Sequence, residues 1–305
     1  MRTLDPQPAP PLRDGVGASR VRLPAGDWPD LLSFLCAQFP SVDAEQWRSR
    51  IARGRVLDEQ DRPVAPDAPY RPGALIAYYR ELPPEAPIPF EASVLFRDAH
   101  LLVADKPHFL PVMPAGRFLQ ETLLVRLKQQ LGLPDLVPLH RIDRGTAGLV
   151  VFSVNAQTRA AYQALFPQRR VEKCYEAWAP VCPALTAPHV HRSRLVAGSP
   201  FFRMCEVDGP PNSETRIEVM AREGQLAQYR LQPITGRKHQ LRVHLAALGA
   251  PIVNDPFYPA LRPELEDDYT RPMQLLARSI AFMDPLTGRA HRYDSRRRLA
   301  GPTAG

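Results

Sequence analysis

The sequence predicts a mixed α and β protein that divides into two domains. With 305 residues the chain can bury a sizeable core, and this length favours more than one domain. Its 35 prolines favour turns and extended connections over a helical bundle. Segments with apolar residues at helical spacing occur between short alternating or β-branched apolar runs, which are typical of strands.

The charge balance is basic. Lys and Arg number 39 against 32 Asp and Glu, which gives a formal net charge of +7. A basic surface suits a polyanionic partner such as a nucleic acid, although composition alone does not establish one. The chain has no P-loop, no G-x-G-x-x-G and no metal-binding cluster in its sequence, so nucleotide-cofactor and metal chemistry are not expected.

Cysteine usage and hydropathy suggest a cytoplasmic protein without a membrane partner. The four cysteines form no C-x-x-C pair and have no zinc spacing, so they are expected to be reduced packing residues. No apolar run approaches membrane-spanning length, and residues 1–11 lack a secretory core. A monomer is expected.

The N-terminal part is predicted to begin with a flexible leader, residues 1–25, which is rich in Pro and poor in large apolar residues. A small domain of residues 26–82 follows. Helical spacing predicts helices over 28–39 and 43–53, the second capped by Ser41 or Asp43.

Two short strands, near residues 54–56 and 71–76, complete this small domain. The order of two helices, I-A-R-G-R-V and R-P-G-A-L-I resembles the S-four-type RNA-binding module of ribosomal proteins. The resemblance implies RNA contacts by Arg48 and Arg53. A scaffold without RNA binding is the alternative, because Asp58-Glu59 stand where the module usually has Asn-Gly.

After a linker of residues 83–89, a larger domain is expected over residues 90–285, followed by a basic tail of residues 286–305. Asp105-Lys106-Pro107 ends the second of its strands and is expected to be a structural strand exit. Residues 183–214 show little periodicity and are expected to be loops and an irregular hairpin. The other expected strands are at 94–96, 101–104, 149–152, 171–178, 215–221, 226–232 and 274–277. The other expected helices are at 121–131, at 155–166 with Asn155 as its cap, and after Thr235, which is expected to cap a helix with Leu241, Leu245 and Leu248 facing the core.

The stretch from His140 to Phe152 is the strongest candidate for a functional site. It places one acid, Asp143, between Arg141 and Arg144 at the mouth of a buried strand. Flanking guanidinium groups favour the ionised carboxylate, which can act as a nucleophile or base. Gly145 and Gly148 allow a tight turn and a close backbone approach. A surface loop of ion pairs is the alternative.

This stretch, H-R-I-D-R-G-T-A-G-L-V-V-F, resembles the catalytic signature H-R-L-D-R-x-T-S-G-L-L of the RluA-type pseudouridine synthases. Lys173 and Tyr175 match the K-x-Y of that family's next strand. Residues 235–245, T-G-R-K-H-Q-L-R-V-H-L, match its T-G-R-x-H-Q-I-R-V-H-L. Residues 249–258 and 274–277 follow two further family patterns that we interpret as structural. In the first, G-x-P-I-x-G-D-x-x-Y, Asn254 replaces the second glycine.

The resemblance covers roughly residues 90–285 and implies an α+β fold. The catalytic domain would have a mixed, mainly antiparallel central sheet, preceded by the small S-four-like α/β module. The implied activity is the isomerisation of uridine to pseudouridine in RNA, without a cofactor or metal. Asp143 would be the nucleophile or base, Arg242 its partner, and Tyr175 the ring that stacks on the base. The expected RNA contacts of this domain are His140, Arg141, Arg144, Thr146, Lys173, Arg237 and Lys238.

Ribosomal RNA is the favoured target, because the S-four-type module is commonest in family members that act there, and transfer RNA is the alternative. Two other functions stay open: an RNA-binding assembly factor without essential catalysis, and a hydrolase that uses Asp143 with His140. His189 and His191 lie two apart with no third metal ligand in view, and His239 and His244 flank Arg242. No metal site is predicted from either pair.

Overall fold

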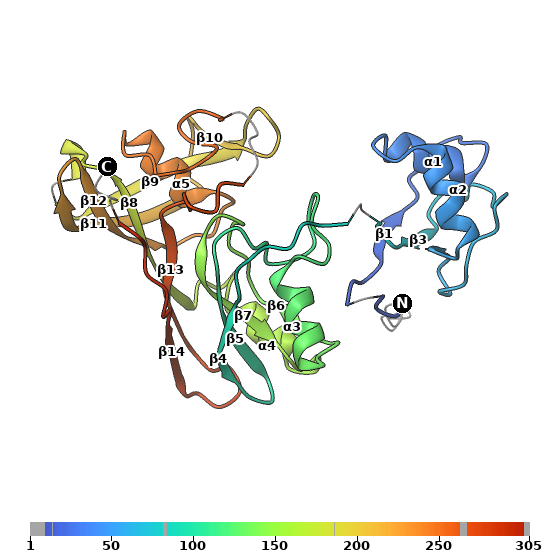
Figure 1. Ribbon diagram of the computed structural model, residues 1–305, viewed down its shortest axis with the longest axis horizontal. Helices are drawn as coiled ribbons and strands as arrows, with labels where there is room; N and C mark the ends of the chain where they lie inside the picture. Colours follow the sequence, from blue (N-terminus) through green and yellow to red (C-terminus); the bar gives the residue numbers. More distant parts are fainter. Residues whose placement is uncertain (1–9, 14, 82–83, 186, 263–266, 302–305) are drawn as a thin grey trace. The chain divides into compact units, whose positions relative to one another are not determined.

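The computed structural model describes residues 10–13, 15–81, 84–185, 187–262 and 267–301. The chain divides into two compact units (Figure 1). The first comprises Met1–Glu85 with Gly116–Gln120, and the second Ala86–Ala115 with Glu121–Gly305. The division after residue 85 falls inside the predicted linker of residues 83–89, of which residue 83 lies outside the described part of the chain.

The first unit combines a three-stranded antiparallel sheet with two helices. The sheet order is β1 (Ser19–Arg22), β3 (Leu75–Tyr78), β2 (Val56–Leu57). Helices α1 (Leu31–Gln38) and α2 (Ala44–Ala52) supply Phe34, Leu35, Trp47 and Ile51 to its core. Both predicted helices are confirmed. Each begins after an aspartate, Asp30 or Asp43, whose side chain accepts the backbone N–H three residues on at 2.7 Å.

The predicted leader of residues 1–25 is wrong in its C-terminal part. Residues 19–22 form strand β1, which pairs with β3, and Leu23 is buried. Val21 and Leu23 both pack into the core of the first unit. Burial of these two side chains holds residues 19–23 in place, although the segment has few large apolar residues. Residues 1–9 and 14, which belong to the same prediction, lie outside the described residues.

The second unit is organised on an eleven-stranded sheet with the order β10-β9-β11-β12-β8-β13-β7-β5-β4 (Figure 1). Strand β14 pairs with β13, and β6 with β7. Every pairing is antiparallel except that of β13 with β7, which confirms the mixed, mainly antiparallel sheet. The strands are β4 (Ser93–Arg97), β5 (Leu101–Lys106), β6 (Val137–Pro138), β7 (Ala147–Ser153), β8 (Val171–Pro180), β9 (His189–Ala197), β10 (Met204–Val207), β11 (Ser213–Glu223), β12 (Leu226–Pro233), β13 (Leu275–Met283) and β14 (Ala290–Asp294).

Helices cover this sheet in two places. α5 (Gln240–Ala247) packs Leu241 and Leu245 into a core formed with β8, β11, β12 and β13, as the spacing of its leucines predicts. Tyr162 of α4 (Arg159–Ala164) packs with residues of β5 and β7. α3 (Leu123–Leu131) begins after the capping side chain of Thr122, and a 3₁₀ turn, η1, spans Pro183–Leu185. Among the helices described, none has the length and apolar character needed to cross a membrane.

Two predictions of irregular or helical structure are wrong. The interval 183–214 contains the regular strands β9 and β10 and the start of β11. The inward face of β9 carries His189, His191 and Ser193, and these polar residues conceal the apolar alternation that signals a strand. The helix expected over 155–166 is only α4, because the Asn155 side chain accepts the N–H of Gln157 in a local turn instead of capping a helix.

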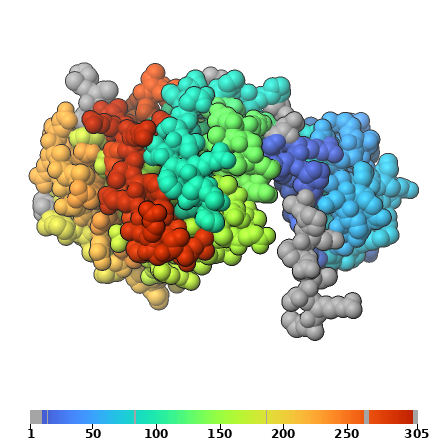
Figure 2. Space-filling model, turned by 90° about the horizontal axis from the view of Figure 1, so that it is seen from below, coloured from blue at the N-terminus to red at the C-terminus, as the bar shows by residue number. Residues whose placement is uncertain are grey.

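The predicted basic tail is also wrong, because residues 290–294 form β14 as part of the sheet. Strand β14 lies on the surface beside β4 (red beside teal, Figure 2), where Tyr293 packs against Phe96 at 5.2 Å between ring centroids. Beyond it, the Ser295 hydroxyl donates to the buried carboxylate of Asp105 at 2.8 Å, and Arg297 donates to the carbonyl oxygen of Asp105. Residues 302–305 lie outside the described part of the chain.

Candidate active site

Asp143 lies in a cavity of about 620 Å³ in the second unit. The loop that enters β7, strand β8 and the segment that leads into α5 all contribute to its walls. Asp143, Tyr175 and Arg242, which the sequence predicts as catalytic, all line this cavity. The three motifs, far apart in the chain, therefore meet in one place.

The Asp143 loop is shaped by the close approach of two parallel strands. Gly148 has a φ of +107°, and a Cβ atom there would lie 2.2 Å from the carbonyl oxygen of Ala277 on β13. Only glycine fits such an approach, as the sequence predicts. The backbone N–H of Thr146 donates to the Asp143 carbonyl at 3.1 Å and closes the turn.

Lys106 stabilises the Asp143 loop through hydrogen bonds to backbone carbonyl groups. Its side chain is fully buried, and Nζ donates to the carbonyl oxygens of Pro107, Leu110 and Arg144 at 2.7–3.1 Å. Burial lowers the pKa of Lys106 well below its ordinary value, against the effect of the Asp143 charge. Three carbonyl acceptors satisfy the three donors of an ammonium group. Lys106 is therefore a structural residue, as predicted for the strand exit.

Arg242 joins two carboxylates. Its Nη1 donates to Asp143 Oδ2 at 2.9 Å, while Nε and Nη2 donate to the two oxygens of Asp255 at 2.7 Å each. The Arg242 side chain is 4% exposed, that of Asp255 is 0% exposed and that of Asp143 is 27% exposed. The bidentate contact fixes the guanidinium plane, so Arg242 presents one defined N–H to Asp143.

Asp255 orients Arg242, although its sequence pattern predicts only a structural role. It also accepts the backbone N–H groups of Phe257 and Tyr258, so its orientation does not depend on Arg242. Asp255 lies in the family-like segment 249–258, but nothing in that sequence pattern indicates that its carboxylate contacts Arg242. Only the fold brings residues 242 and 255 together.

The electrostatics of this group keep Asp143 ionised. Burial alone would raise the pKa of Asp143, but the charge of Arg242 and its hydrogen bond hold it below the ordinary value. Burial alone would lower the pKa of Arg242, but the hydrogen bond to Asp255 and the charges of both carboxylates raise it. The Asp143 carboxylate is thus available as an anion with one oxygen held by Arg242.

His239 is a second neighbour that sequence reasoning considers only as a metal ligand. Its Nε2 lies 3.9 Å from Asp143 Oδ1, and its Nδ1 is 2.9 Å from the hydroxyl of Tyr258. The residue has a φ of +56°, a left-handed conformation that is uncommon for non-glycine residues. Burial lowers the pKa of His239 to about 4, so the ring is neutral at neutral pH.

Tyr175 and Lys173 project from the same face of β8 into the cavity, as the alternation of a strand requires. Burial, and then the negative charge of Asp143, raise the pKa of Tyr175, which keeps its phenol neutral. Burial lowers the pKa of Lys173. An aromatic ring beside a fixed carboxylate is suited to a flat substrate.

Four more of the predicted RNA contacts line the cavity: His140, Arg141, Thr146 and Arg237. Arg141 and Arg237 are exposed, whereas Thr146 is buried. His140 stacks on Phe166 at 5.1 Å, and its Nε2 accepts the N–H of Val151 at 3.1 Å. Burial, and then the Lys173 charge, lower the pKa of His140 to about 3. A neutral ring whose acceptor nitrogen is occupied cannot activate a nucleophile, which argues against a hydrolase that uses Asp143 with His140.

The remaining predicted contacts lie outside the cavity. Both terminal nitrogens of Arg144 pair with the carboxylate of Asp267. Lys238 is exposed on the segment before α5. In the first unit, Arg53 donates to Glu81 at 2.8 Å, and Arg48 lies 3.7 Å from Glu45 in an exposed ion pair.

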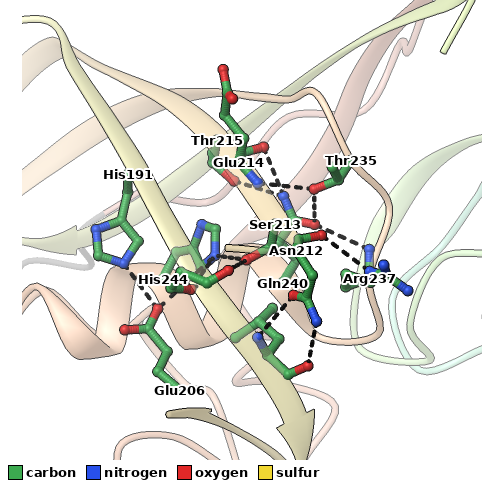
Figure 3. Close-up of polar contacts among 12 residues, drawn as sticks. His191, Glu206, Asn212, Ser213, Glu214, Thr215, Thr235, Arg237, Gln240 and His244 are labelled. Carbon is green, nitrogen blue, oxygen red and sulfur yellow. Dashed lines mark hydrogen bonds and ion pairs between the residues drawn. The ribbon is translucent and has the colours of Figure 1, made fainter. Parts of the chain in front are cut away.

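Gln240 holds the segment that forms one wall of the cavity (Figure 3). Its side-chain oxygen accepts the Thr235 hydroxyl at 2.6 Å and the N–H of Arg237 at 3.0 Å, while its nitrogen donates to Glu214 and Thr215 of β11. The prediction that Thr235 caps α5 is wrong, because its hydroxyl is used by Gln240 and by the N–H of Glu214.

An ionised carboxylate with a fixed guanidinium, in a cavity with an aromatic wall, defines an enzyme site for nucleophilic or base chemistry. Comparison with known proteins agrees with this class. Residues 100–247 match the family model described as RNA pseudouridylate synthase. The dual-specificity RNA pseudouridine synthase RluA of Vibrio vulnificus is 35% identical over 60% of this chain and 74% of its own length.

Two further relatives cover more of the chain. The mitochondrial tRNA pseudouridine(32) synthase of Saccharomyces cerevisiae is 29% identical over 76% of this chain and 51% of its own length. The solved structure of human RNA pseudouridylate synthase domain containing 4 is 26% identical, covers 67% of this chain and 87% of its own, and has a TM-score of 0.53. The chain belongs to the RluA family of RNA pseudouridine synthases, and it is an isomerase that modifies RNA.

Proposed function

We propose that this enzyme converts specific uridines of ribosomal RNA to pseudouridine, with Asp143 as the reacting carboxylate. The observation that carries this proposal is the ionised Asp143, held by Arg242 at 2.9 Å beside Tyr175 in one cavity. One oxygen of Asp143 is held by Arg242, and the other is left to meet the substrate.

The substrate uridine must leave its stack to reach this cavity. A base inside an RNA helix cannot be approached on all the atoms that react, so the nucleotide turns outward and its base stacks on an aromatic ring. Tyr175 would provide that ring. Base–aromatic stacking contributes about 1–3 kcal/mol, a useful part of the cost of unstacking.

The reaction exchanges one bond for another. Asp143 either attacks the sugar carbon C1′ or removes a sugar proton, and the bond from C1′ to N1 of uracil breaks. The released uracil rotates while held in the cavity, and C5 forms the new bond to C1′ as the Asp143–C1′ bond breaks or, in the second route, as the sugar proton is returned. The C5 proton is lost while N1 ends with a proton. Atoms and electrons balance without an oxidant, reductant or nucleotide cofactor. Arg242 would orient Asp143 and keep it ionised until it reacts.

The basic residues at the cavity are the proposed phosphate contacts. Arg141 and Arg237 are exposed at its walls, and Lys173 reaches inside. Phosphate contacts position the substrate without reading its sequence. Arg144 is a weaker candidate, because a phosphate would have to replace the carboxylate of Asp267. The S-four-like unit, with Arg48 and Arg53, would add affinity for structured RNA.

Transfer RNA is the second candidate target, because the yeast relative is named a tRNA pseudouridine(32) synthase. The test is to incubate wild type and Asp143→Ala with unmodified ribosomal RNA and, separately, with unmodified transfer RNA, and to map pseudouridine chemically. We expect discrete sites in ribosomal RNA with wild type alone. Sites only in transfer RNA would reassign the target.

An RNA-binding role without essential catalysis is the remaining alternative. It is tested in cells by replacing the chain with Asp143→Asn, which keeps the shape of the side chain and removes its charge. Restoration of growth or ribosome assembly by this variant to the level of wild type would favour binding as the essential function. Cytoplasmic location and a monomeric state stay predictions.

A further inference from the structure

A second cluster of polar side chains lies outside the Asp143 cavity, between α5 and the end of the sheet formed by β9, β10 and β11. Its members are His191 on β9, Glu206 on β10 and His244 on α5 (Figure 3). Their ring nitrogens and carboxylate oxygen lie within 4.8 Å of one another. The mechanism proposed above uses none of the three.

The strand register explains why these residues converge. His191 and Leu195 lie four apart on β9, so they share one face of the sheet. Glu206 is paired with Leu195, which places it on the same face. Helix α5 packs on that face through Val243, which shares a core cluster with Leu195, and His244 points from the helix toward the strands (Figure 3).

The distances suit a shared ligand. Oε1 of Glu206 lies 2.9 Å from Nε2 of His191 and 4.0 Å from Nε2 of His244. Zinc binds nitrogen and oxygen at about 2.0–2.2 Å, so neighbouring donors in a tetrahedral site lie roughly 3–4 Å apart. The three side chains therefore require only small shifts to bind one ion.

The ligand atoms have hydrogen-bond partners that a metal ion can replace. His244 is fully buried, so its ring nitrogen Nε2 faces protein groups of the cluster. The His191 and Glu206 side chains are 16% and 24% exposed, which leaves a route from solvent. The hydroxyls of Ser193 and Ser213 lie 3.2 and 2.9 Å from His244 Nε2 and can turn toward a bound ion or its water.

We propose that His191, Glu206 and His244 form a binding site for a divalent transition-metal ion, with Zn²⁺ as the fitting representative. Two imidazoles and one carboxylate are a donor set that zinc accepts, with water in the fourth position. Bound there, the ion ties the β9–β10 hairpin to α5, two residues from Arg242. It takes no part in the isomerisation.

Zinc binding is tested with the untagged, full-length chain after removal of metals by a chelator. Titration with Zn²⁺ in a calorimeter gives stoichiometry and affinity, and visible absorption of added Co²⁺ reports the coordination geometry. The test variants are His191→Ala and Glu206→Gln, which change partly exposed side chains. His189→Ala is the matched control, because His189 lies two residues away on the same strand.

We expect wild type and His189→Ala to bind one Zn²⁺ and to give a tetrahedral Co²⁺ spectrum. Loss of a side chain that only hydrogen-bonds to a metal ligand lowers metal affinity by ~10–100-fold. His191→Ala and Glu206→Gln remove ligands themselves, so each should lower the affinity for Zn²⁺ by more than this. Wild type that binds no ion, or test variants that bind as wild type does, would overturn the site. A loss with His189→Ala equal to that with His191→Ala would contradict the assigned ligands. Circular dichroism without metal verifies that every variant is folded.

Discussion

Two of the buried polar residues of helix α5, Arg242 and His244, belong to clusters whose chemistry differs. Arg242 meets the carboxylates of Asp143 and Asp255, and His244 meets Glu206, His191 and two serine hydroxyls. Residues two apart on an α-helix are rotated by about 200° around its axis and so point to nearly opposite sides, which lets one helix serve both groups. The helix therefore couples the catalytic cavity to the end of the sheet.

The difference between the two groups lies in how charge is compensated. On the Arg242 side a permanent cation pairs with two carboxyl groups, and it lowers the pKa of Asp143. On the His244 side the buried histidine stays neutral, with its pKa lowered to about 3. The first arrangement holds an anion ready for chemistry, and the second leaves uncharged nitrogen donors that a proton or metal ion can occupy.

Removal of the cation should have the largest effect. Arg242→Gln leaves Asp255 buried without its bidentate partner, so we expect the free energy of unfolding to fall by about 3–5 kcal/mol in urea denaturation. Arg237→Gln, on the exposed segment before α5, is the control and should change it little. Arg242→Gln combined with Asp255→Asn should regain part of the loss. A double variant as unstable as the sum of the two single variants would contradict the account.

The aromatic wall gives the next effect. Tyr175→Ala should lower kcat/KM by roughly 10–100-fold, because stacking on a base contributes about 1–3 kcal/mol. Tyr175→Phe keeps the ring and should retain most of the activity under single-turnover conditions. A Phe variant as weak as the Ala variant would show that the hydroxyl, rather than stacking, is the essential part.

The pH dependence of stability separates the two sides of α5. The pKa of His244 is about 3 in the folded protein and about 6.5 in the unfolded chain, so between these values the unfolded chain binds a proton that the folded protein does not. The contribution of His244 to the free energy of unfolding is therefore complete above pH ~6.5 and is lost as the pH falls toward 3. His244→Asn, measured with chelator present, should lessen the acid slope by at most about 1.4 kcal/mol per pH unit. Asp143, with a lowered pKa, contributes stability that is present above pH ~3.9 and is lost only as the pH falls below that value. An unchanged slope in His244→Asn would contradict the neutral state.

The smallest effect concerns the first unit. Arg48 and Glu45 are largely exposed and 3.7 Å apart, so Arg48→Ala should change the free energy of unfolding by less than about 0.5 kcal/mol. If this unit binds RNA, the same variant should weaken binding of the full chain and lessen its salt dependence. Binding that is unaffected by both Arg48→Ala and Arg53→Ala would favour the scaffold interpretation.

The sequence predicts those parts in which local pattern and tertiary environment agree. The buried run of β7, the alternating strands β11 and β12 and the leucine face of α5 are of this kind. Asn254 stands where the family pattern has glycine, and its φ is +62°. Glycine and asparagine both tolerate this left-handed conformation, so the local backbone accounts for either residue at this position.

The parts that could not be predicted depend on contacts distant in the chain. Strand β9 has polar residues on its buried face, because they meet a histidine of α5 and a glutamate of β10. Asp255 reaches Arg242 only through the turn that follows α5. A periodicity analysis treats each segment alone and cannot detect either arrangement.

The central claim, that Asp143 is the reacting carboxylate, is tested by single-turnover release of tritium from RNA labelled at C5 of uridine. The C5 hydrogen is lost when C5 bonds to the sugar, so its release measures completion of the reaction. We expect wild type to release tritium and Asp143→Asn, folded and still able to bind the RNA, to release none above background. Release by Asp143→Asn at a rate near that of wild type would contradict the account.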